Sequence, residues 1–421
     1  MARFKTYPSI AVTLFGLVSV ASLPSAYSYN GAPGDTVSSS LISGSIVTDY
    51  LTAGVPGGLQ FNLVDAPDGI TAQVRSGFIT AANYWSSLVA DAGFTINLQI
   101  GFRDLGAGIL GSTGSNQTQQ NYSSFRDALI THKTSADDAA ATNSLQSGSS
   151  FAMLLNGTSS DPNGSGSRTP YIDNDGDTNN MTIQMTTANA RTLGLSVNYG
   201  TGDNSFDGLI AFSNRFTFDF DQSDGITLGS YDFIGVATHE IGHALGFISG
   251  INRLDTQNAN NSYLRDDELA NVSPVDLFRY TSVSAITTAN GVTGIPNFTL
   301  GTYSPDFTPG NGTVGPIDQY FSLDNGKTSI ASLSTGVNFG DGQQASHWKD
   351  NLNLGIMDPT SAQGELRRFS TNDLRLFDAI GYTLRPGALE SVSAPEPGSL
   401  PLILLAGTLL IRRCRRRRGV K

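Results

Sequence analysis

The sequence predicts a mixed α+β domain whose N-terminal part has α/β character, and three patterns support this. Alternating apolar residues over 58–64 and 94–102 are typical of two strands. Between them, residues 70–90 carry apolar side chains at helical spacing. A strand–helix–strand order favours two parallel strands joined by a right-handed crossover. We therefore expect a twisted mixed sheet at the start of the domain.

Later segments complete the expected fold. Residues 208–218 have strand character, either as an edge strand on which a peptide could lie or as a core strand. Residues 232–245 show helical spacing, with Ser230 or Asp232 as the candidate cap and Gly246 as the stop. Residues 250–343 are rich in Gly, Asn, Thr and Pro, so we expect irregular or hairpin structure there, with one short buried strand at 275–280.

A last helix is expected at 373–380, because Ser370 to Asp373 form a capping box and Gly381 follows as a stop. Residues 383–394 are then interpreted as a linker. The main domain is predicted to span 46–382, with 29–45 as a flexible Gly/Ser-rich lead-in.

The helix predicted at 232–245 contains His239-Glu240-Ile-Gly-His243, and the chain has only 4 histidines. On a helix, the two imidazoles would lie about 40° apart and about 6 Å along the axis, so both can face one ion. Glu240 would lie beside that ion, where a carboxylate suits a general base acting on water. Two imidazoles do not hold a catalytic zinc, so a third protein ligand is required. Ser249, with a neutral hydroxyl, is a poor candidate.

His347 is the better candidate, because Trp348 follows it and Met357-Asp-Pro comes ten residues later. Together with the helix motif and Gly246, this arrangement resembles the site of a leishmanolysin-like metzincin. In that family a long insertion separates the second and third zinc ligands, and a methionine turn lies under the metal. The spacing of 104 residues between His243 and His347 agrees with such an insertion.

This resemblance implies a metzincin-like catalytic domain with an insertion at about 250–343 before the third ligand. It implies a zinc endopeptidase acting on protein or peptide substrates, with His239, His243 and His347 as ligands and Met357 as the Met-turn residue. Glu240 would be the catalytic base. The chain differs from leishmanolysins in one respect: that family contains disulfides, whereas the one cysteine here is Cys414.

Other interpretations stay open. In a thermolysin-type site Glu268, 25 residues after His243, would be the third ligand. A non-catalytic extracellular matrix or biofilm protein with a degenerate metal site is a further alternative. His132 lies in a polar stretch and is expected to be a solvated helix or loop residue.

A second metal motif is the run Asp173-Asn-Asp175-Gly-Asp177, which resembles half of a calcium loop. The glycine and glutamate that an EF-hand requires are replaced by Thr178 and Gln184. Calcium at Asp173, Asp175 and Asp177 and a plain acidic turn are therefore both open.

The two ends of the chain are interpreted as targeting signals. Residues 1–28, with early cations, an apolar run and small residues, predict a signal peptide. Residues 395–421 combine Pro-Glu-Pro, a short apolar run and an arginine cluster, and resemble a PEP-CTERM sorting signal. That resemblance implies export in a bacterium with an outer membrane and removal of the tail by an exosortase. The mature protein would be extracellular or on the cell surface, meeting the membrane only through its transient tail.

Composition narrows the possible partners. The net charge is −11, which argues against nucleic acid. Removing both ends also removes Cys414, so the mature chain would contain no disulfide despite its export.

Overall fold

The computed structural model describes residues 12–13, 51–67, 69–90, 93–199, 205–281, 306–309 and 319–393. The expected lead-in (29–45), the sorting tail (395–421) and all of the expected signal peptide except Val12–Thr13 lie outside these residues. Those two residues form β1, which pairs with β16 at Thr360–Ser361. No helix among the described residues is long and apolar enough to cross a membrane.

The described residues form an α+β fold with a mixed five-stranded sheet, as the sequence predicts. Its order is β2-β3-β4-β10-β5. β3 and β4 are parallel and are joined by α1, and β10 is parallel to β4. The outer strands β2 and β5 run antiparallel to their neighbours. The bounds are β2 Leu51–Ala53, β3 Gln60–Asp65, α1 Ala72–Leu88, β4 Thr95–Arg103, β5 Gly111–Ser115 and β10 Gly208–Ser213.

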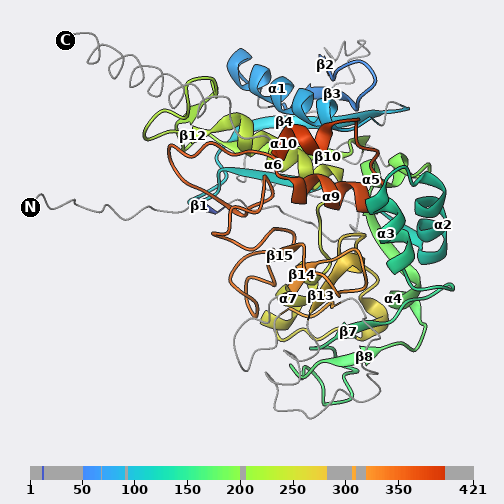
Figure 1. The fold of residues 1–421 in the computed structure, drawn as a ribbon. Helices are drawn as coiled ribbons and strands as arrows, with labels where there is room; N and C mark the ends of the chain where they lie inside the picture. The colour runs from blue at the N-terminus through green and yellow to red at the C-terminus, as the bar shows by residue number, and fades with distance from the viewer. Residues whose placement is uncertain are drawn as a thin grey trace, which may run out of the picture.

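One face of this sheet is covered by α1 and by α6 (Phe233–Leu245), which also contact each other (Figure 1). Phe78 of α1, Phe212 of β10 and Phe233 of α6 meet there, with ring centroids 4.4–5.4 Å apart. Gly77 permits the close approach, because a Cβ at that position would lie 2.4 Å from the Phe233 ring. Aromatic packing therefore fixes the start of α6 over the sheet.

The edge role considered for residues 208–218 is wrong, because β10 lies between β4 and β5. Its central position agrees with its almost wholly apolar sequence, Gly-Leu-Ile-Ala-Phe-Ser, which is typical of a buried strand. The edge belongs to β5, whose sequence Gly-Ser-Thr-Gly-Ser carries no apolar signal that could have predicted a strand.

The segment between β5 and β10 forms small helices and hairpins on one side of the sheet and in the lower part of Figure 1. β6 pairs with β9, and β7 pairs with β8. The bounds are β6 Gln117–Asn121, α2 Tyr122–His132, α3 Ala136–Ser144, β7 Met153–Leu155, β8 Tyr171–Asp173, α4 Thr178–Met181, β9 Thr182–Thr186 and α5 Thr187–Thr192. β11 (Phe218–Asp219) and β12 (Tyr231–Asp232) then lead into α6.

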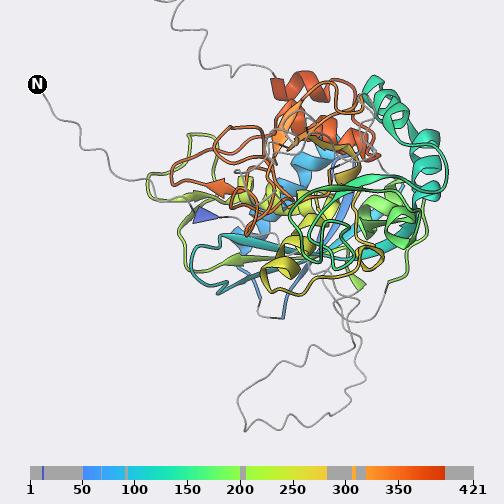
Figure 2. The ribbon, with the colours of Figure 1, turned by 90° about the horizontal axis from the view of Figure 1, so that it is seen from below.

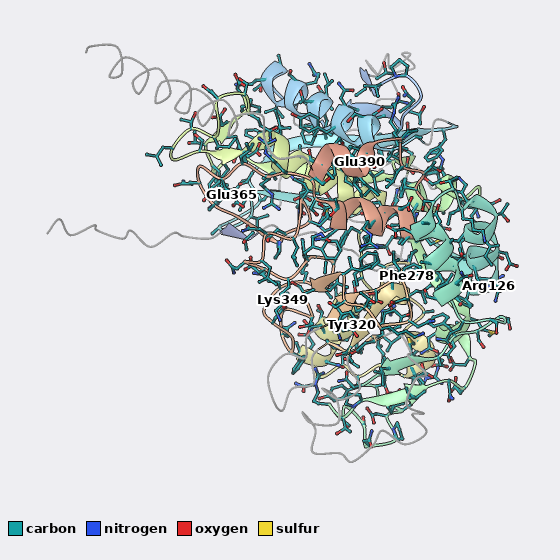
Figure 3. All side chains as sticks on the ribbon, viewed as in Figure 1. Arg126, Phe278, Tyr320, Lys349, Glu365 and Glu390 are labelled. Carbon is teal, nitrogen blue, oxygen red and sulfur yellow. The ribbon has the colours of Figure 1, made fainter. Side chains whose placement is uncertain are left out.

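The described part of the insertion contains hairpin structure, as expected, and also an unpredicted helix. The bounds are α7 Ile251–Ala259, η2 Asp266–Glu268, η3 Asp276–Phe278, β13 Arg279–Thr281, β14 Gln319–Phe321 and β15 Ala331–Leu333. The face that α7 buries combines Ile251 and Leu254 with Asp255 and Asn258, so its apolar periodicity is weak. Phe278 and Tyr320 lie in this lower part of the molecule, whereas Glu390 lies in the upper part (Figure 3).

The short strand expected at 275–280 is only partly correct. Residues 276–278 form a 3-10 turn, and the strand begins at Arg279. The Asp276 carboxylate accepts hydrogen bonds from the Ser273 amide and hydroxyl at 3.0 and 2.9 Å, which stabilises a turn at this point.

The last predicted helix is confirmed as α9, Thr371–Ala379, with the capping box of Ser370 and Asp373 in place. The segment expected to be a plain linker is instead folded onto the domain. Leu384 bridges to Val89, and α10 follows at Ala388–Ser393 (Figure 2). Arg385 explains this attachment, since its guanidinium donates to the carbonyls of Pro56 and Ser86 at 3.2 Å.

Candidate metal centre

Helix α6 carries two of the candidate ligands and runs through the core, with every residue from Phe233 to Leu245 buried. Asp232 is its N-cap, because its carboxylate accepts the Gly235 amide at 2.9 Å. Gly246 ends the helix at a φ of 133°, a conformation that favours glycine. The predicted start and stop are thus both confirmed.

Strand β5 fixes the position of α6 through two hydroxyl groups. Thr113 Oγ1 donates to the Glu240 carbonyl at 3.0 Å, and Ser115 Oγ donates to the His243 carbonyl at 3.0 Å. These bonds hold the ligand-bearing turn against the edge of the sheet.

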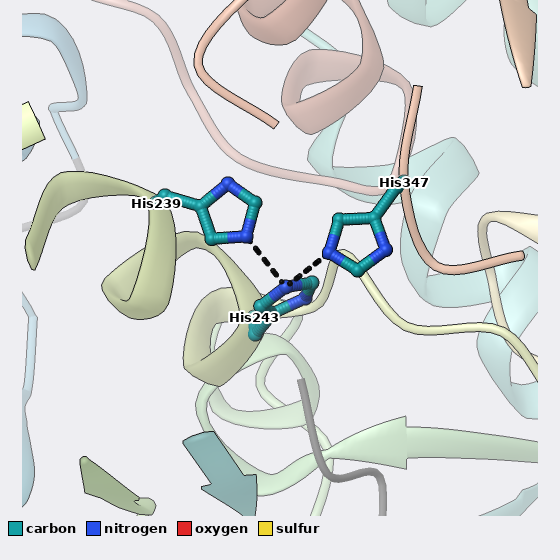
Figure 4. Close-up of side chains that lie close together, drawn as sticks. All are labelled: His239, His243 and His347. Atoms are coloured by element: carbon teal, nitrogen blue, oxygen red, sulfur yellow. Dashed lines mark hydrogen bonds between the residues drawn. The ribbon is translucent and has the colours of Figure 1, made fainter. Parts of the chain in front are cut away.

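His239, His243 and His347 lie together and are buried, and we call them the histidine cluster (Figure 4). His243 Nε2 lies 3.1 Å from His239 Nε2 and 3.2 Å from His347 Nε2. The His347 ring is nearly parallel to that of His239, with centroids 5.2 Å apart. The structure therefore brings the distant histidine to the two on the helix.

The other ring nitrogens of the histidine cluster all face backbone carbonyls. The Nδ1 partners of His239, His243 and His347 are the oxygens of Ile356 at 2.8 Å, Phe247 at 2.7 Å and Gln344 at 3.2 Å, respectively. A carbonyl only accepts, so each Nδ1 carries the hydrogen and each Nε2 presents a lone pair.

Burial keeps the histidine cluster neutral. It lowers the pKa of His243 to about 4, and it lowers the pKa of His239 and His347 well below the usual value. Three bare lone pairs therefore converge, an arrangement that repels unless a cation lies among them. Neutral imidazole nitrogens are the ligands that zinc and related metals take.

Glu240 follows His239 on α6 and is fully buried. Its Oε2 lies 2.7 Å from Thr113 Oγ1 and shares the one hydrogen of that hydroxyl with the Glu240 carbonyl. Oε1 has no hydrogen-bond partner among the described residues. Burial raises the Glu240 pKa to about 8, although the Thr113 hydrogen bond opposes the rise. Gly111 of β5 makes room for this carboxylate, since a Cβ there would lie 2.7 Å from Oε1.

Met357, the residue that the resemblance assigns to a methionine turn, packs against Gly242 of α6. It is buried, and a Cβ on Gly242 would lie 2.5 Å from its sulfur. Arg367 holds the surrounding turn, donating through Nη2 to the carbonyls of Ile356 at 2.8 Å and Asp358 at 2.6 Å. Arg367 was missed in the sequence, where it lies in a polar stretch without a motif.

Asp373 joins the two segments that carry His347 and Met357. It is fully buried and accepts hydrogen bonds from Trp348 Nε1 at 2.7 Å and from the Ile356 amide at 2.9 Å. The capping box predicted this residue as part of a helix start, but its contact with Trp348 was not foreseen.

Replacing Asp373 with alanine is expected to lower the free energy of unfolding by about 3–5 kcal/mol, because several buried donors would lose their acceptor. Urea denaturation measures the change. Glu390→Ala is the control, since Glu390 is exposed and its removal should alter stability by less than about 0.5 kcal/mol. An equal effect of both substitutions would contradict a supporting role for Asp373.

The insertion is tied to the site through a buried ion pair. Arg279 Nε lies 3.4 Å from Asp276 Oδ1, both side chains are inaccessible to solvent, and Arg279 also donates to the Ala345 carbonyl. Asp276 accepts the Ser249 hydroxyl at 2.6 Å. This bond agrees with the exclusion of Ser249 as a ligand and connects the exit of α6 to the segment before His347.

Two other candidates lie outside the histidine cluster. Glu268, the ligand of the thermolysin-type alternative, is in η2, where its side chain is 46% exposed and accepts the Arg265 amide. That alternative is therefore wrong in this structure, because the insertion places η2 with the lower hairpins. His132 ends α2 and is half-buried.

The acidic motif also differs from expectation. Asp173 and Asp175 lie close together, but the third carboxylate within 4.8 Å is Asp266 rather than Asp177. Asp177 is used instead as the N-cap of α4, where it accepts the Asn179 amide at 3.2 Å.

Comparison of the chain with known protein families, with curated proteins and with solved structures gave no match. The geometry of the described residues is thus the basis for a functional conclusion.

Proposed function

We propose that the protein is a zinc-dependent endopeptidase of the metzincin type with leishmanolysin-like ligand spacing. The observation that carries this proposal is the convergence of three uncharged Nε2 atoms, two of them on the same helix as a buried carboxylate with an unpaired oxygen. A structural metal site has no use for such a carboxylate, whereas a hydrolytic site requires a base.

The histidine cluster fits zinc. Three imidazoles held by backbone carbonyls leave the fourth position of a tetrahedral ion for water or substrate, as in catalytic zinc sites. A bound zinc ion would supply Lewis acidity, which lowers the pKa of water and polarises a peptide carbonyl.

Glu240 has a carboxylate oxygen without a hydrogen-bond partner, which is available for proton transfer. Its Oε1, which lacks a partner, would accept a proton from the attacking water and pass it to the amine that leaves. Thr113 holds Oε2 and so orients the carboxylate. A zinc ion in the histidine cluster would favour the ionised form of Glu240, which is the form that accepts a proton.

Strand β5 offers a place for the substrate backbone. It is one of the two edge strands of the five-stranded sheet, and its Gly111 and Thr113 contact Glu240. An extended peptide that pairs with this edge would pass beside the base, which suits cleavage within a chain.

The sequence signals at the two ends support an exported enzyme. The proposed leader at 1–28 and the proposed PEP-CTERM tail at 395–421 would direct it to the extracellular space or the cell surface of a bacterium with an outer membrane. An exosortase-type enzyme would be its processing partner.

Casein hydrolysis tests the function directly. We expect cleavage by the purified protein, loss of cleavage after treatment with a zinc chelator, and recovery when zinc is added. Absence of hydrolysis in the zinc-loaded protein would favour the alternative of a non-catalytic matrix protein.

A further inference from the structure

A second group of metal-ligand type lies in the lower part of the molecule. Carboxylate oxygens of Asp173, Asp175 and Asp266 are within 4.8 Å of one another, and we call these residues the acidic cluster. Asp173 ends β8, Asp175 follows in the next loop, and Asp266 begins η2. β8 lies at the lower end of Figure 1, whereas α6 with its histidines lies in the upper part.

Among the described residues, no ion pair joins a basic side chain to the acidic cluster. Burial, with a further contribution from Asp175 and Asp266, raises the pKa of Asp173 to about 7. The adjacent Arg265 pairs instead with Asp267 and Glu268, at 3.2 and 3.8 Å. A cation would remove the repulsion that these carboxylates otherwise impose on the fold.

A separate observation points to a ligand. Asn179 is fully buried and its carboxamide contacts the acidic cluster, because Nδ2 donates to Asp173 Oδ2 at 2.7 Å. The carbonyl oxygen of the same carboxamide, Oδ1, has no hydrogen-bond partner among the residues that the structure describes. A buried acceptor without a donor is unfavourable, and coordination of a cation would satisfy it.

We propose that Asp173, Asp175 and Asp266 bind one Ca²⁺, with the Asn179 carbonyl oxygen as a neutral ligand. Calcium takes six to eight oxygen ligands, including carboxylates, amide carbonyls and waters, in flexible geometry. Magnesium prefers to keep its waters and to use one or two carboxylates. The absence of nitrogen and sulfur ligands in the acidic cluster separates this site from the histidine cluster.

Calcium at this place would join two segments that the chain separates widely. Asp173 and Asp175 belong to the loop between β8 and α4, and Asp266 belongs to the insertion. The cation would therefore clamp the insertion to the lower hairpins, a role that disulfides fill in other exported proteins. Clamping of this kind stabilises only the folded chain.

The first test titrates the zinc-loaded protein with CaCl₂, using calorimetry and thermal unfolding. We expect one Ca²⁺ per chain and a rise in Tm of about 3–5 °C at a calcium concentration one hundred times the Kd. MgCl₂ should give a much smaller rise. A wild-type protein that does not respond to calcium would overturn the proposal.

Matched variants locate the site. Asp266→Asn and Asp175→Asn should each weaken calcium binding at least about tenfold, because each loses a charged ligand. Asp221→Asn is the control: this exposed aspartate also lies in a turn, where it accepts the Ser223 amide at 2.9 Å. Wild-type affinity in Asp266→Asn would refute the assignment. If Asp266→Asn does not fold, the calcium affinity of Asp175→Asn decides the outcome, because Asp175 is exposed.

Tyr171 provides a spectroscopic reporter, since its hydroxyl lies 3.3 Å from Asp266 Oδ2. Tb³⁺ that replaces calcium should emit strongly on tyrosine excitation. Tyr171→Phe should remove most of this emission and leave calcium affinity within about threefold of wild type. Unchanged emission in Tyr171→Phe would place the ion elsewhere and contradict the proposal.

Discussion

Replacing Glu240 with glutamine is expected to reduce peptide hydrolysis by roughly 10²–10⁴-fold, the usual contribution of a general base. Glutamine keeps the shape of the side chain, and its carbonyl oxygen can accept the Thr113 hydrogen bond in place of Glu240 Oε2. It cannot take a proton from water. Initial rates on casein, with zinc content measured on the same samples, give the comparison.

The variant should bind zinc as wild type does, because Glu240 is outside the group of three histidines. It should also be at least as stable, since a buried carboxylate with one unpaired oxygen is replaced by a neutral amide. Glu390→Gln, on the exposed surface, controls for removal of a negative charge. Zinc-dependent hydrolysis that survives in Glu240→Gln would assign the base to another group.

The segments that the sequence predicts well are those with strong local periodicity. α1 and the strands on either side of it have regular apolar spacing, and the bounds of all three were predicted within about two residues. The helix α6 combines that spacing with a chemical motif and with two terminators, Asp232 and Gly246. Local pattern and tertiary environment agree here, so propensity is not overridden.

What the sequence did not reveal depends on polar side chains that act over long separations. Arg367 and Asp373 organise the turn around Met357 through backbone groups, which have no sequence signature. Asp373 also accepts a hydrogen bond from the distant Trp348 side chain. Asp266 joins Asp173 only because the insertion folds back on the lower hairpins. Such contacts follow from the arrangement of elements and cannot be deduced from spacing.

Strand β5 shows a different limit. Its small and polar residues lack the alternation typical of strands, but the structure uses this composition at the edge of the sheet. Gly111 leaves room for the Glu240 carboxylate, and Thr113 donates a hydrogen bond to it. The composition that obscured the strand is thus the one that accommodates the base.

Replacing His347 with alanine is expected to weaken zinc binding by more than about 100-fold, because loss of a supporting residue alone costs 10- to 100-fold. The two remaining imidazoles, on one helical turn, would leave half of a tetrahedral ion without protein ligands. Hydrolysis should fall in parallel at limiting zinc. Metal content after dialysis and competition with a chromogenic chelator measure the affinity.

His132→Ala is the matched control, since His132 lies at the end of α2 and outside the cluster. It should retain wild-type zinc affinity and hydrolysis.

Thermal unfolding separates ligation from packing: zinc should raise the Tm of wild type and of His132→Ala but have little effect on His347→Ala. If His347 only fills space, His347→Ala would unfold at a lower temperature yet keep its response to zinc, and the three-histidine site would be wrong. The short Nε2 separations favour ligation, because three neutral rings with lone pairs turned inward have no other source of attraction.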